Sequence, residues 1–268
     1  MYQTKGFKME TLEKKIHKLA QLIVDSDHIV ALTGAGMSTE SGIPDFRSPE
    51  TGLWTKKDPY EFASINSYRA NASKNLGSML ELGLTIFKSR PNKGHRSLTK
   101  LQRMGKLEGV MTQNIDRLHQ KAKTKNVVEF HGNVMEAKCM QCRNVFPITT
   151  MVNQALKGKE PICEECNGLL KPNAVFFGEA LDSKDLAAAD GMLKNCDLLI
   201  VLGSSLVVYP VAFYPHKAIS GGARLAIINI QETDMDSSAD VVIHEKIGEV
   251  LPKVVNLVQT KIKEKPKE

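Results

Sequence analysis

Two Cys-x-x-Cys pairs constrain the fold of this chain more than any other feature. Cys139 and Cys142 form the first pair, and Cys163 and Cys166 form the second, twenty residues further along. This spacing is typical of zinc ribbons, in which four thiolates surround one ion and leave no position open for water. The sequence therefore predicts one structural zinc ion rather than disulfides. The fifth cysteine, Cys196, precedes an apolar run and is expected to be a small buried hydrophobe.

The composition is that of a folded globular protein. Of 268 residues, 42% are hydrophobic and 25% are charged, so the chain can bury a core and gives no compositional sign of disorder. No apolar run reaches the length of a membrane span, and residues 1–10 lack the apolar centre of a signal peptide. We expect a cytoplasmic monomer without a membrane or specific nucleic-acid partner. The net charge of +6 is expected on solvated helix faces and in the tail.

Short apolar runs alternate with helical stretches along most of the chain. The expected strands cover 28–33, 109–112, 127–130, 197–202, 224–230 and 240–243. The expected helices cover 11–24, 183–195, 211–220 and 247–261. In the first helix, Leu12, Ile16, Leu19 and Ile23 place apolar side chains on one face. This alternation predicts an α/β fold, a doubly wound Rossmann-like parallel sheet with helices on both faces.

Two regions interrupt the alternation. Residues 51–90 are compatible with helices and contain no strand candidate, and residues 135–170 carry the cysteine pairs among short extended pieces. We expect them to form a smaller inserted module, a helical insertion plus a zinc ribbon. The remaining segments would form the Rossmann-like domain and a charged tail: 10–50, 91–134 and 171–262 for the domain, and 263–268 for the tail.

A glycine-containing turn follows the first expected strand. Gly34 and Gly36 let backbone amides approach a phosphate closely, and a helix N-terminus beyond them would add favourable partial charge. A lone Gly-x-Gly is a weak signal, and Thr39 occupies the place of the third glycine of the dinucleotide fingerprint. No acidic residue ends a second strand about twenty residues later. The pattern therefore favours nucleotide binding but disfavours an ordinary nicotinamide dehydrogenase.

Polar residues also follow four later strands. Asn114 and Asp116 lie in the segment after 109–112, where ligands bind in open α/β sheets, although either residue could simply cap a helix. His131 ends the next strand beside a glycine, where an imidazole could act as a general base or have a structural role. Gly203 to Ser205 close another strand, and Asn229 closes the one after it. Such small polar residues suit phosphate and ribose contacts or a tight turn.

Taken in order, these segments resemble the sirtuin family, of the bacterial type. The matching segments are GAGMSTESGIPDFR from Gly34, TQNIDRLH from Thr112, FHG from Phe130, the two cysteine pairs, FFGE from Phe176, GSSLVVYP from Gly203, and Asn229. The resemblance runs from about residue 28 to residue 251. It implies NAD bound in a cleft between a Rossmann-like domain and a small zinc-containing module, with an acyl-lysine peptide in the same cleft.

The resemblance also assigns residues to NAD and to the reaction. His131 would be the general base, and Asn114 and Asp116 would hold the nicotinamide amide and a nearby water. The residues expected to contact NAD are Gly34, Ala35, Gly36, Thr39, Phe46, Arg47, Gln113, Ile115, Gly203, Ser204, Ser205, Asn229, Ile230 and Ile247. The amide oxygen of acyl-lysine would first displace nicotinamide from the ribose. His131 would then draw a proton from a ribose hydroxyl, which would attack the imidate carbon and take the acyl group onto ADP-ribose.

The peptide would bind as an added strand between two segments. The residues expected to contact it are Val175, Phe177, Gly178, Glu179 and Val208. Backbone pairing of this kind accepts many peptide sequences. The tyrosine and arginine of the family's acidic-acyl deacylases have no clear counterpart, although Tyr68 and Arg69 are neighbours. This departure favours neutral acyl groups over succinyl groups.

Two other functions compete with protein-lysine deacylation. ADP-ribosyl transfer to protein would also begin with release of nicotinamide, and the sequence does not separate the two reactions. A non-catalytic module could instead use the zinc ribbon to bind nucleic acid, with the glycine segment as a plain turn. His131 and the polar strand ends argue against that reading, and Phe146 is the main aromatic residue beside the cysteine pairs for base stacking.

Overall fold

The computed structural model describes residues 10–46, 52–55 and 58–264, and its centre is a six-stranded parallel sheet in the order β3-β2-β1-β7-β8-β9. The strands are β1 (Ile29–Thr33), β2 (Gly109–Thr112), β3 (Val127–Glu129), β7 (Leu198–Leu202), β8 (Arg224–Ile228) and β9 (Val241–Ile243). The chain moves outward from β1 to β3 on one side and from β7 to β9 on the other. This reversal confirms the predicted doubly wound α/β class. In such sheets, ligands bind at the carboxyl ends of the strands beside the reversal.

The two central strands are apolar because both faces of the sheet are covered. Every residue of β1 and β7 is buried, and the strands pair in register from Ile29 with Leu198 to Thr33 with Leu202. Strands buried on both faces need continuous apolar sequence, as in Leu-Leu-Ile-Val-Leu of β7. The strands predicted over 197–202 and 224–230 are each shorter in the structure, and residues 229 and 230 lie in the loop after β8.

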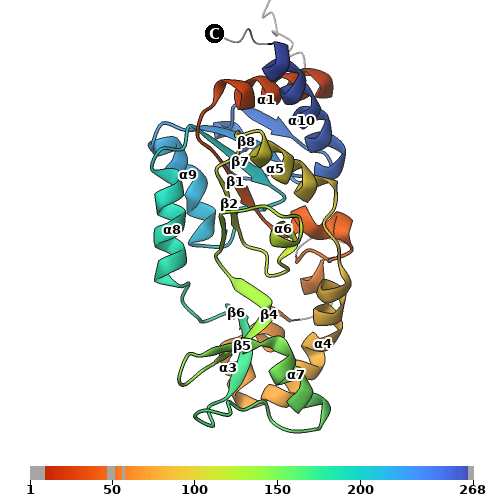
Figure 1. Cartoon of the computed structure of the whole chain (residues 1–268), viewed down its shortest axis with the longest axis vertical. Helices are drawn as coiled ribbons and strands as arrows, with labels where there is room; N and C mark the ends of the chain where they lie inside the picture. Colours follow the sequence, from red (N-terminus) through yellow and green to blue (C-terminus); the bar gives the residue numbers. More distant parts are fainter. Residues whose placement is uncertain (1–9, 47–51, 56–57, 265–268) are drawn as a thin grey trace, which may run out of the picture.

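Helices cover the two faces of this sheet (Figure 1). One core cluster joins α1 (Leu12–Asp25), α5 (Lys93–Arg103) and α10 (Ile247–Glu264) to alternate strand residues such as Ile29. The other joins α8 (Ser183–Leu193) and α9 (Tyr214–Ser220) to their neighbours such as Val30. Across the described part of the chain, no helix has the length and hydropathy needed to cross a membrane.

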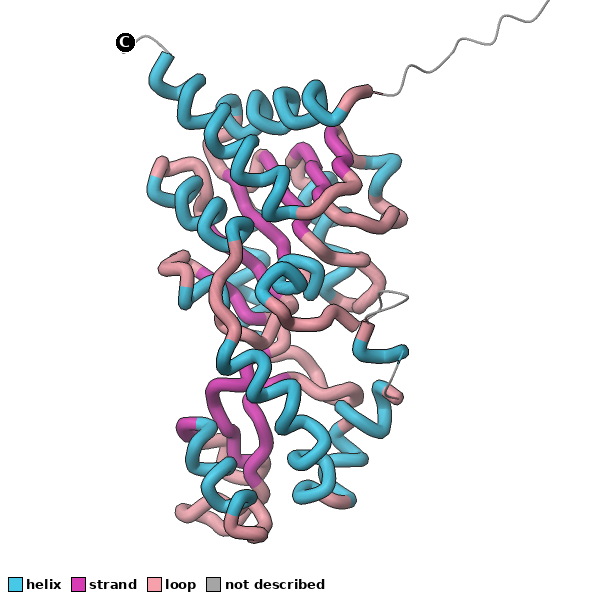
Figure 2. Tube along the Cα trace, turned by 90° about the vertical axis from the view of Figure 1, so that its right-hand side faces the viewer, coloured by secondary structure: helices cyan, strands magenta, loops and turns pink. Residues whose placement is uncertain are grey.

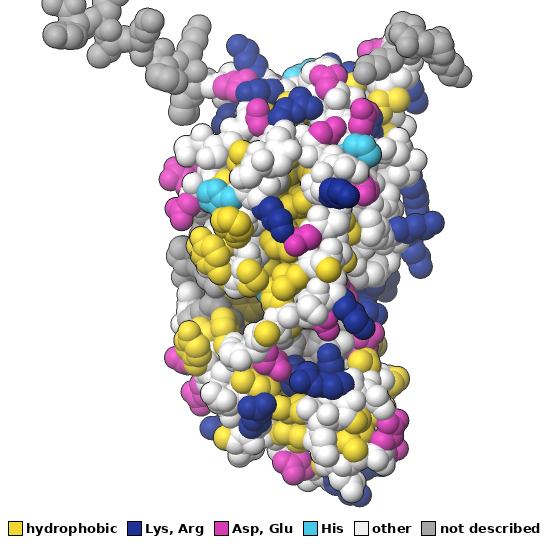
Figure 3. Space-filling view, turned by 90° about the vertical axis from the view of Figure 1, so that its left-hand side faces the viewer, with side chains coloured by type: hydrophobic (Ala, Val, Ile, Leu, Met, Phe, Trp, Pro, Cys, Tyr) yellow, Lys and Arg dark blue, Asp and Glu magenta, His cyan; other side chains and the backbone are white. Residues whose placement is uncertain are grey.

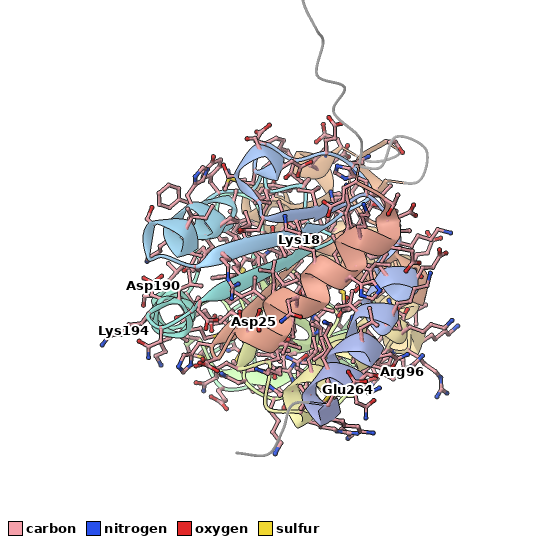
Figure 4. All side chains as sticks on the ribbon, turned by 90° about the horizontal axis from the view of Figure 1, so that it is seen from above. Lys18, Asp25, Arg96, Asp190, Lys194 and Glu264 are labelled. Carbon is pink, nitrogen blue, oxygen red and sulfur yellow. The ribbon has the colours of Figure 1, made fainter. Side chains whose placement is uncertain are left out.

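Seen from above, α1 and α10 cross the end of the sheet side by side (Figure 4). Thr11 caps α1, its hydroxyl accepting from the amide of Lys14, and Ile16, Leu19 and Ile23 are buried. Leu12 is exposed, although the sequence predicts it on the apolar face, because it begins the first turn and extends beyond the helices below. The charged side chains labelled in Figure 4 are all exposed, as expected for solvated helix faces: Lys18, Asp25, Arg96, Asp190, Lys194 and Glu264.

A second, antiparallel sheet lies at the other end of the molecule (Figures 1 and 2). Its strands, in the order β5-β4-β6, are β4 (Gly132–Cys139), β5 (Val145–Pro147) and β6 (Leu170–Ala174). Its helical neighbours are α2 (Pro59–Ala63), α3 (Ile65–Ala70), α4 (Ala72–Lys88) and α7 (Ile148–Leu156). Strand β4 begins a few residues before the predicted range 135–170, and β6 ends a few residues after it.

Tyr68 connects the helical segment to the small sheet. Its side chain is fully buried, its hydroxyl donates to the carbonyl of Leu170 at 2.6 Å, and its ring contacts Phe176 edge-on at 5.5 Å. Burial raises the pKa of the Tyr68 hydroxyl, with a further contribution from the charge of Glu160. The segments that interrupt the alternation therefore pack together, although the exact domain boundaries stay a prediction.

Candidate functional site

A continuous cavity of about 660 Å³ runs between the carboxyl edge of the large sheet and the small sheet. Figure 3 shows one face of the molecule, which is notched between these two parts and bordered there by apolar side chains. The cavity brings together nearly all the residues predicted to contact NAD or peptide: Gly34, Ala35, Gly36, Thr39, Phe46, Gln113, Asn114, Ile115, Asp116, His131, Val175, Phe177, Gly178, Glu179, Gly203, Ser204, Ser205, Val208, Asn229, Ile230 and Ile247. Arg47 lies outside the described residues.

Two glycine turns meet at the sheet edge. The amide of Gly34 donates to Leu202 and that of Gly36 donates to Gly203, both at about 3.0 Å or less. A Cβ atom on Gly34 would lie 2.6 Å from the Gly203 carbonyl oxygen, which real structures do not tolerate. Gly203 itself has φ of 62°, and a Cβ there would meet the amide of Met37 at 2.3 Å. Only glycine fits where these two turns cross, which we call the glycine crossing. On the cavity side it exposes backbone without side chains.

The segment after Gly34 is a 3-10 helix, η1 (Ala35–Ser41), rather than the α-helix that a dinucleotide fingerprint would begin. Ser38 lies on it, buried, and its hydroxyl donates to Asp116 at 2.6 Å. The side-chain amide of Asn114 donates to the Gly34 carbonyl at 3.0 Å and to Ser38 at 3.2 Å. Ser38 therefore joins the two strand ends. Its sequence segment was recognised, but no sequence signal distinguished its role from that of neighbouring hydroxyl residues.

Asp116 is a buried carboxyl at the start of α6 (Leu118–Lys121). One oxygen accepts from Ser38, and the other accepts from the backbone amide of Leu118 at 2.7 Å. Burial raises the pKa of the Asp116 carboxyl, whereas these two hydrogen bonds and the charge of Lys121 oppose the rise. The helix-capping alternative considered for Asp116 is thus correct in part, since it caps α6 and also lines the cavity.

His131 lies between β3 and β4 and lines the cavity. Its Nδ1 is 2.9 Å from the carbonyl oxygen of Gln113, which can only accept, so this nitrogen carries a proton. Burial lowers the pKa of His131, and the bond to Gln113 partly offsets this. A neutral ring with a proton on Nδ1 keeps the Nε2 lone pair available. This is the state that a general base requires.

Two further histidines lie beneath this edge and were not predicted. His119 Nε2 is 2.9 Å from the hydroxyl of Thr33, which donates to Thr112 at 2.8 Å, and Thr112 in turn accepts from the Asn114 amide at 3.0 Å. The ring of His95 is 4.9 Å from that of His119. Burial lowers the pKa of His95 to about 2 and that of His119 to about 4. Both rings are therefore neutral parts of the support beneath Asn114.

The segment predicted to contact the peptide is anchored on one side. Phe177 donates its amide to Ala63 at 2.8 Å and accepts from the amide of Ile65 at 3.1 Å. Lys171 is buried and its ammonium contacts Glu179 at 3.0 Å, while Glu179 also accepts from the Phe176 amide. Gly178 has a φ of 89°. Among the described residues, neither its backbone amide nor its carbonyl has a hydrogen-bond partner. Pairing with an added strand is thus confined to few positions.

The four paired cysteines converge, as predicted. Their sulfur atoms all lie within 4.8 Å of one another, with Cys139 3.5 Å from Cys166 and Cys142 3.8 Å from Cys163. Tetrahedral zinc with bonds of about 2.3 Å would separate its sulfur ligands by about 3.8 Å, so the set fits one zinc ion. Among the described residues that line the cavity there is no cysteine, so the four sulfur atoms do not form part of its wall. Cys196 is buried separately, as expected.

The doubly wound sheet, the glycine crossing at its carboxyl edge and the four-sulfur centre define an α/β protein with a nucleotide-binding cleft and a zinc module. Residues 34–210 match the family model described as Sir2 family. The chain belongs to this family, the sirtuins.

Individual relatives agree across nearly the whole chain. NAD-dependent protein deacylase 2 of Archaeoglobus fulgidus is 42% identical over 249 residues, covering 92% of this chain and 98% of that protein. NAD-dependent protein deacetylase of Saccharolobus solfataricus is 40% identical, with coverage of 91% and 98%. One solved structure of a Sir2 enzyme is 41% identical, with a TM-score of 0.85 and coverage of 93% and 99%. A complex of Sir2 with p53 peptide and NAD is 36% identical, with a TM-score of 0.83 and coverage of 92% and 99%.

Proposed function

We propose that this protein is an NAD-dependent protein-lysine deacylase, which transfers the acyl group from lysine to ADP-ribose and releases nicotinamide. One observation carries the proposal. A single cavity brings together the glycine crossing, the Asn114 and Asp116 pair, His131 and the segment around Gly178. A nucleotide, a general base and an extended peptide can therefore meet there. The named relatives are deacylases and deacetylases with the same dependence on NAD.

The glycine crossing is proposed to hold the phosphates and ribose of the adenosine half. Open backbone at Gly34 to Gly36 allows close approach of a pyrophosphate, and the hydroxyl groups of Ser204 and Ser205 offer further donors. In this proposal Thr39, Phe46 and Arg47 also contact this half of NAD. Asn229, Ile230 and Ile247 form the end of the cavity that would hold the adenosine.

Asn114 and Asp116 are proposed to bind the nicotinamide amide, beside Gln113 and Ile115. Their own hydrogen bonds to Gly34, Ser38 and Leu118 fix both side chains before any ligand arrives. Groups held in place in this way need no reorganisation during the reaction. Exclusion of water by the apolar walls would favour attack by the acyl-lysine amide over hydrolysis.

His131 is proposed as the general base. Its Nδ1 donates to Gln113, so Nε2 is free to take the proton from a ribose hydroxyl of NAD. The lowered pKa keeps the ring neutral near physiological pH. By then the acyl-lysine amide oxygen would have replaced nicotinamide on the ribose carbon, and the deprotonated hydroxyl oxygen would attack the amide carbon. Cleavage of the carbon–nitrogen bond with uptake of one water would then give acyl-ADP-ribose and the free lysine amine.

The peptide is proposed to lie between the segment Val175 to Glu179 and Val208. Because Phe177 already pairs with the backbone at Ala63 and Ile65, the backbone of Gly178 is the natural partner of the peptide on this side. The Lys171 to Glu179 ion pair fixes the turn that presents it. Main-chain recognition would place few demands on peptide sequence.

We further propose a cytoplasmic enzyme, because cysteines that form no disulfide suit a reducing compartment. We also propose that it is a monomer. Analytical ultracentrifugation of the purified chain tests the monomeric state.

Product analysis separates deacylation from ADP-ribosyl transfer. The chain is incubated with NAD and an acetyl-lysine peptide, and mass spectrometry follows both the peptide and the ADP-ribose fraction. Deacylation yields acetylated ADP-ribose and free-lysine peptide in equal amounts. An intact acetyl-lysine peptide together with ADP-ribose attached to protein would instead assign the chain to ADP-ribosyl transfer.

A further inference from the structure

His244 lies between two loops that form the adenosine end of the cavity. Strands β8 and β9 are parallel neighbours, and Ile228 pairs with Ile243 at their carboxyl ends. The loop after each strand contributes to the cavity wall. The lining residues from the two loops are Asn229, Ile230, Gln231, Glu245, Lys246 and Ile247. His244 is not a lining residue itself, and it sits at the start of the second loop.

The two ring nitrogens of His244 face two different partners. Nδ1 is 2.9 Å from the carbonyl oxygen of Asn229, and Nε2 is 3.2 Å from a carboxylate oxygen of Asp236. A carbonyl oxygen only accepts, so Nδ1 donates to it. Nε2 adds a second, charge-assisted bond to Asp236 when that nitrogen is also protonated. His244 thus connects the loop after β8 to the 3-10 turn η4 (Asp236–Ser238).

Asp236 is itself held in place. Its second carboxylate oxygen accepts from the hydroxyl of Thr233 at 2.6 Å, and its backbone amide donates to the carbonyl of Thr233 at 3.1 Å. The side chains of His244 and Asp236 are 35% and 20% exposed, so solvent screens this pair only partly. The Nδ1 donor therefore holds the Asn229 carbonyl, and the fixed Asp236 carboxylate also orients the ring when Nε2 is protonated.

Asn229 is the residue whose placement depends on this arrangement. It is 9% exposed, and its side-chain nitrogen donates to the carbonyl of Gln231 at 2.7 Å, which leaves its side-chain oxygen to accept from a ligand. Its backbone amide donates to Ile243 at 3.1 Å. Because the Asn229 carbonyl also accepts from His244, both the backbone amide and the carbonyl of Asn229 are fixed to β9 and the residue after it.

We infer that His244, oriented by Asp236, is a positioning residue for the adenosine half of NAD, because it fixes the backbone of Asn229 and joins the two loops of that end of the cavity. The inference rests on the proposed function for the identity of the ligand. His244 does not touch the reacting atoms, so its effect falls on NAD affinity alone.

Three variants separate the two contacts of the ring. In His244→Asn, the amide nitrogen stands near the place of Nδ1 and keeps the donor to Asn229. In His244→Gln, the amide nitrogen stands near the place of Nε2 and keeps only the contact with Asp236. His244→Leu removes both, and His17→Leu, on the exposed surface of α1, is the matched control.

Steady-state kinetics and direct titration with ADP-ribose measure the outcome. We expect His244→Leu to raise both the KM for NAD and the Kd for ADP-ribose about fivefold, the effect of one lost hydrogen bond. His244→Asn recovers most of this affinity, and His244→Gln recovers little. The kcat, the KM for peptide and inhibition by free nicotinamide stay at native values, as does every parameter of His17→Leu.

The inference is overturned if His244→Leu binds ADP-ribose with native affinity. It is also overturned if kcat, peptide KM and the melting temperature change together in all three variants, since the role would then be general stability. The titration does not depend on turnover. If the native chain binds ADP-ribose but transfers no acyl group, the proposed function is refuted. The titrations of the native chain and the His244 variants would still test the role of His244.

Discussion

At the scale of single residues, neutral and buried side chains pack beneath the carboxyl edge of the large sheet, which lines the cavity. His95 and His119 lie beneath Asn114 with pKa values lowered to about 2 and about 4 by burial, the second connected to Asn114 through Thr33 and Thr112. Folding therefore requires both imidazoles to stay uncharged. The histidines of an unfolded chain take up protons near pH 6.5, well above these values.

This difference predicts acid sensitivity. Between pH 6.5 and about pH 4 the unfolded chain binds more protons than the native one, so the free energy of unfolding falls as pH falls. We expect the two histidines to lower it by on the order of 2 kcal/mol between pH 6 and pH 5. Urea unfolding at several pH values measures the slope.

The variant His119→Gln keeps a donor near Thr33 but does not titrate, so its stability should depend less steeply on pH. His17→Gln changes an exposed histidine and should leave the slope as in the native chain. Equal slopes for the native chain and His119→Gln would show that His119 is not held neutral.

Sequence patterns predicted the cavity-lining residues that we propose to react better than the residues that support them. His131, Asn114 and Asp116 could be predicted because each follows an apolar strand, and strand ends of open sheets are where ligands bind. Ser38, His95 and His119 could not be assigned in this way. Their roles depend on pairings such as Ser38 with Asp116, between residues far apart in the sequence, which no local pattern encodes.

At the scale of secondary-structure elements, the crossing of the β1 and β7 turns controls the cavity edge. We expect Gly34→Ala to destabilise the fold by roughly 1–3 kcal/mol and to weaken NAD binding, because its Cβ would lie 2.6 Å from backbone at Gly203. Thermal melting and ADP-ribose titration measure the two effects.

Gly191→Ala is the matched control for this substitution. It lies in α8 outside the cavity, and a Cβ there has nothing within 4 Å. Alanine is the better helix former, so stability should rise by about 0.5–1 kcal/mol with unchanged ADP-ribose affinity. Similar losses in both variants would mean that the close approach at Gly34 is not the cause.

The zinc module makes a second prediction at this scale. Cys163→Ser removes one of four converging ligands, so bound zinc should be lost and melting should shift downward by several degrees or more. Metal analysis and calorimetry provide the two measurements. Cys196→Ala, a buried cysteine outside the cluster, should keep its zinc. Native zinc content and melting in Cys163→Ser would contradict the assignment.

The six strands of the large sheet followed from the sequence, since buried parallel strands are continuous apolar runs, whereas α5 and the strands of the small sheet did not. The ends of the elements could not be predicted in this way. For example, β8 ends at Ile228 because the polar Asn229 turns toward the cavity. The helix predicted over 211–220 is a 3-10 turn, η3 (Val211–Phe213), followed by α9, whose first residues include Pro215. Tertiary packing sets these limits, so single-segment periodicity leaves them open.

At the scale of the whole molecule, the cavity joins the polar edge of the large sheet to apolar helices of the small part. Leu76, Met79 and Met151 line it on the side of α4 and α7, and the described lining residues include no arginine, although Lys159, just beyond α7, is among them. Tyr68 cannot bind a carboxylate there, because its hydroxyl is buried against Leu170. We propose that this mainly apolar wall favours neutral acyl chains.

We accordingly expect kcat/KM for an acetyl-lysine peptide to exceed that for the succinyl-lysine peptide of the same sequence about tenfold or more, since a carboxylate placed against the apolar side chains of α4 and α7 is costly to desolvate. Competition between the two peptides in one reaction gives this ratio directly. A succinyl peptide that reacts as fast as the acetyl one would require a cation at the acyl site.

Nicotinamide release from NAD tests the central claim most directly. It is measured at steady state, over many turnovers, with and without acetyl-lysine peptide, in the native chain, in His131→Ala and in the surface control His17→Ala. Deacylation through His131 predicts release that requires the peptide, collapses in His131→Ala and is unchanged in His17→Ala. Release that is indifferent to peptide, or that survives in His131→Ala, would contradict it.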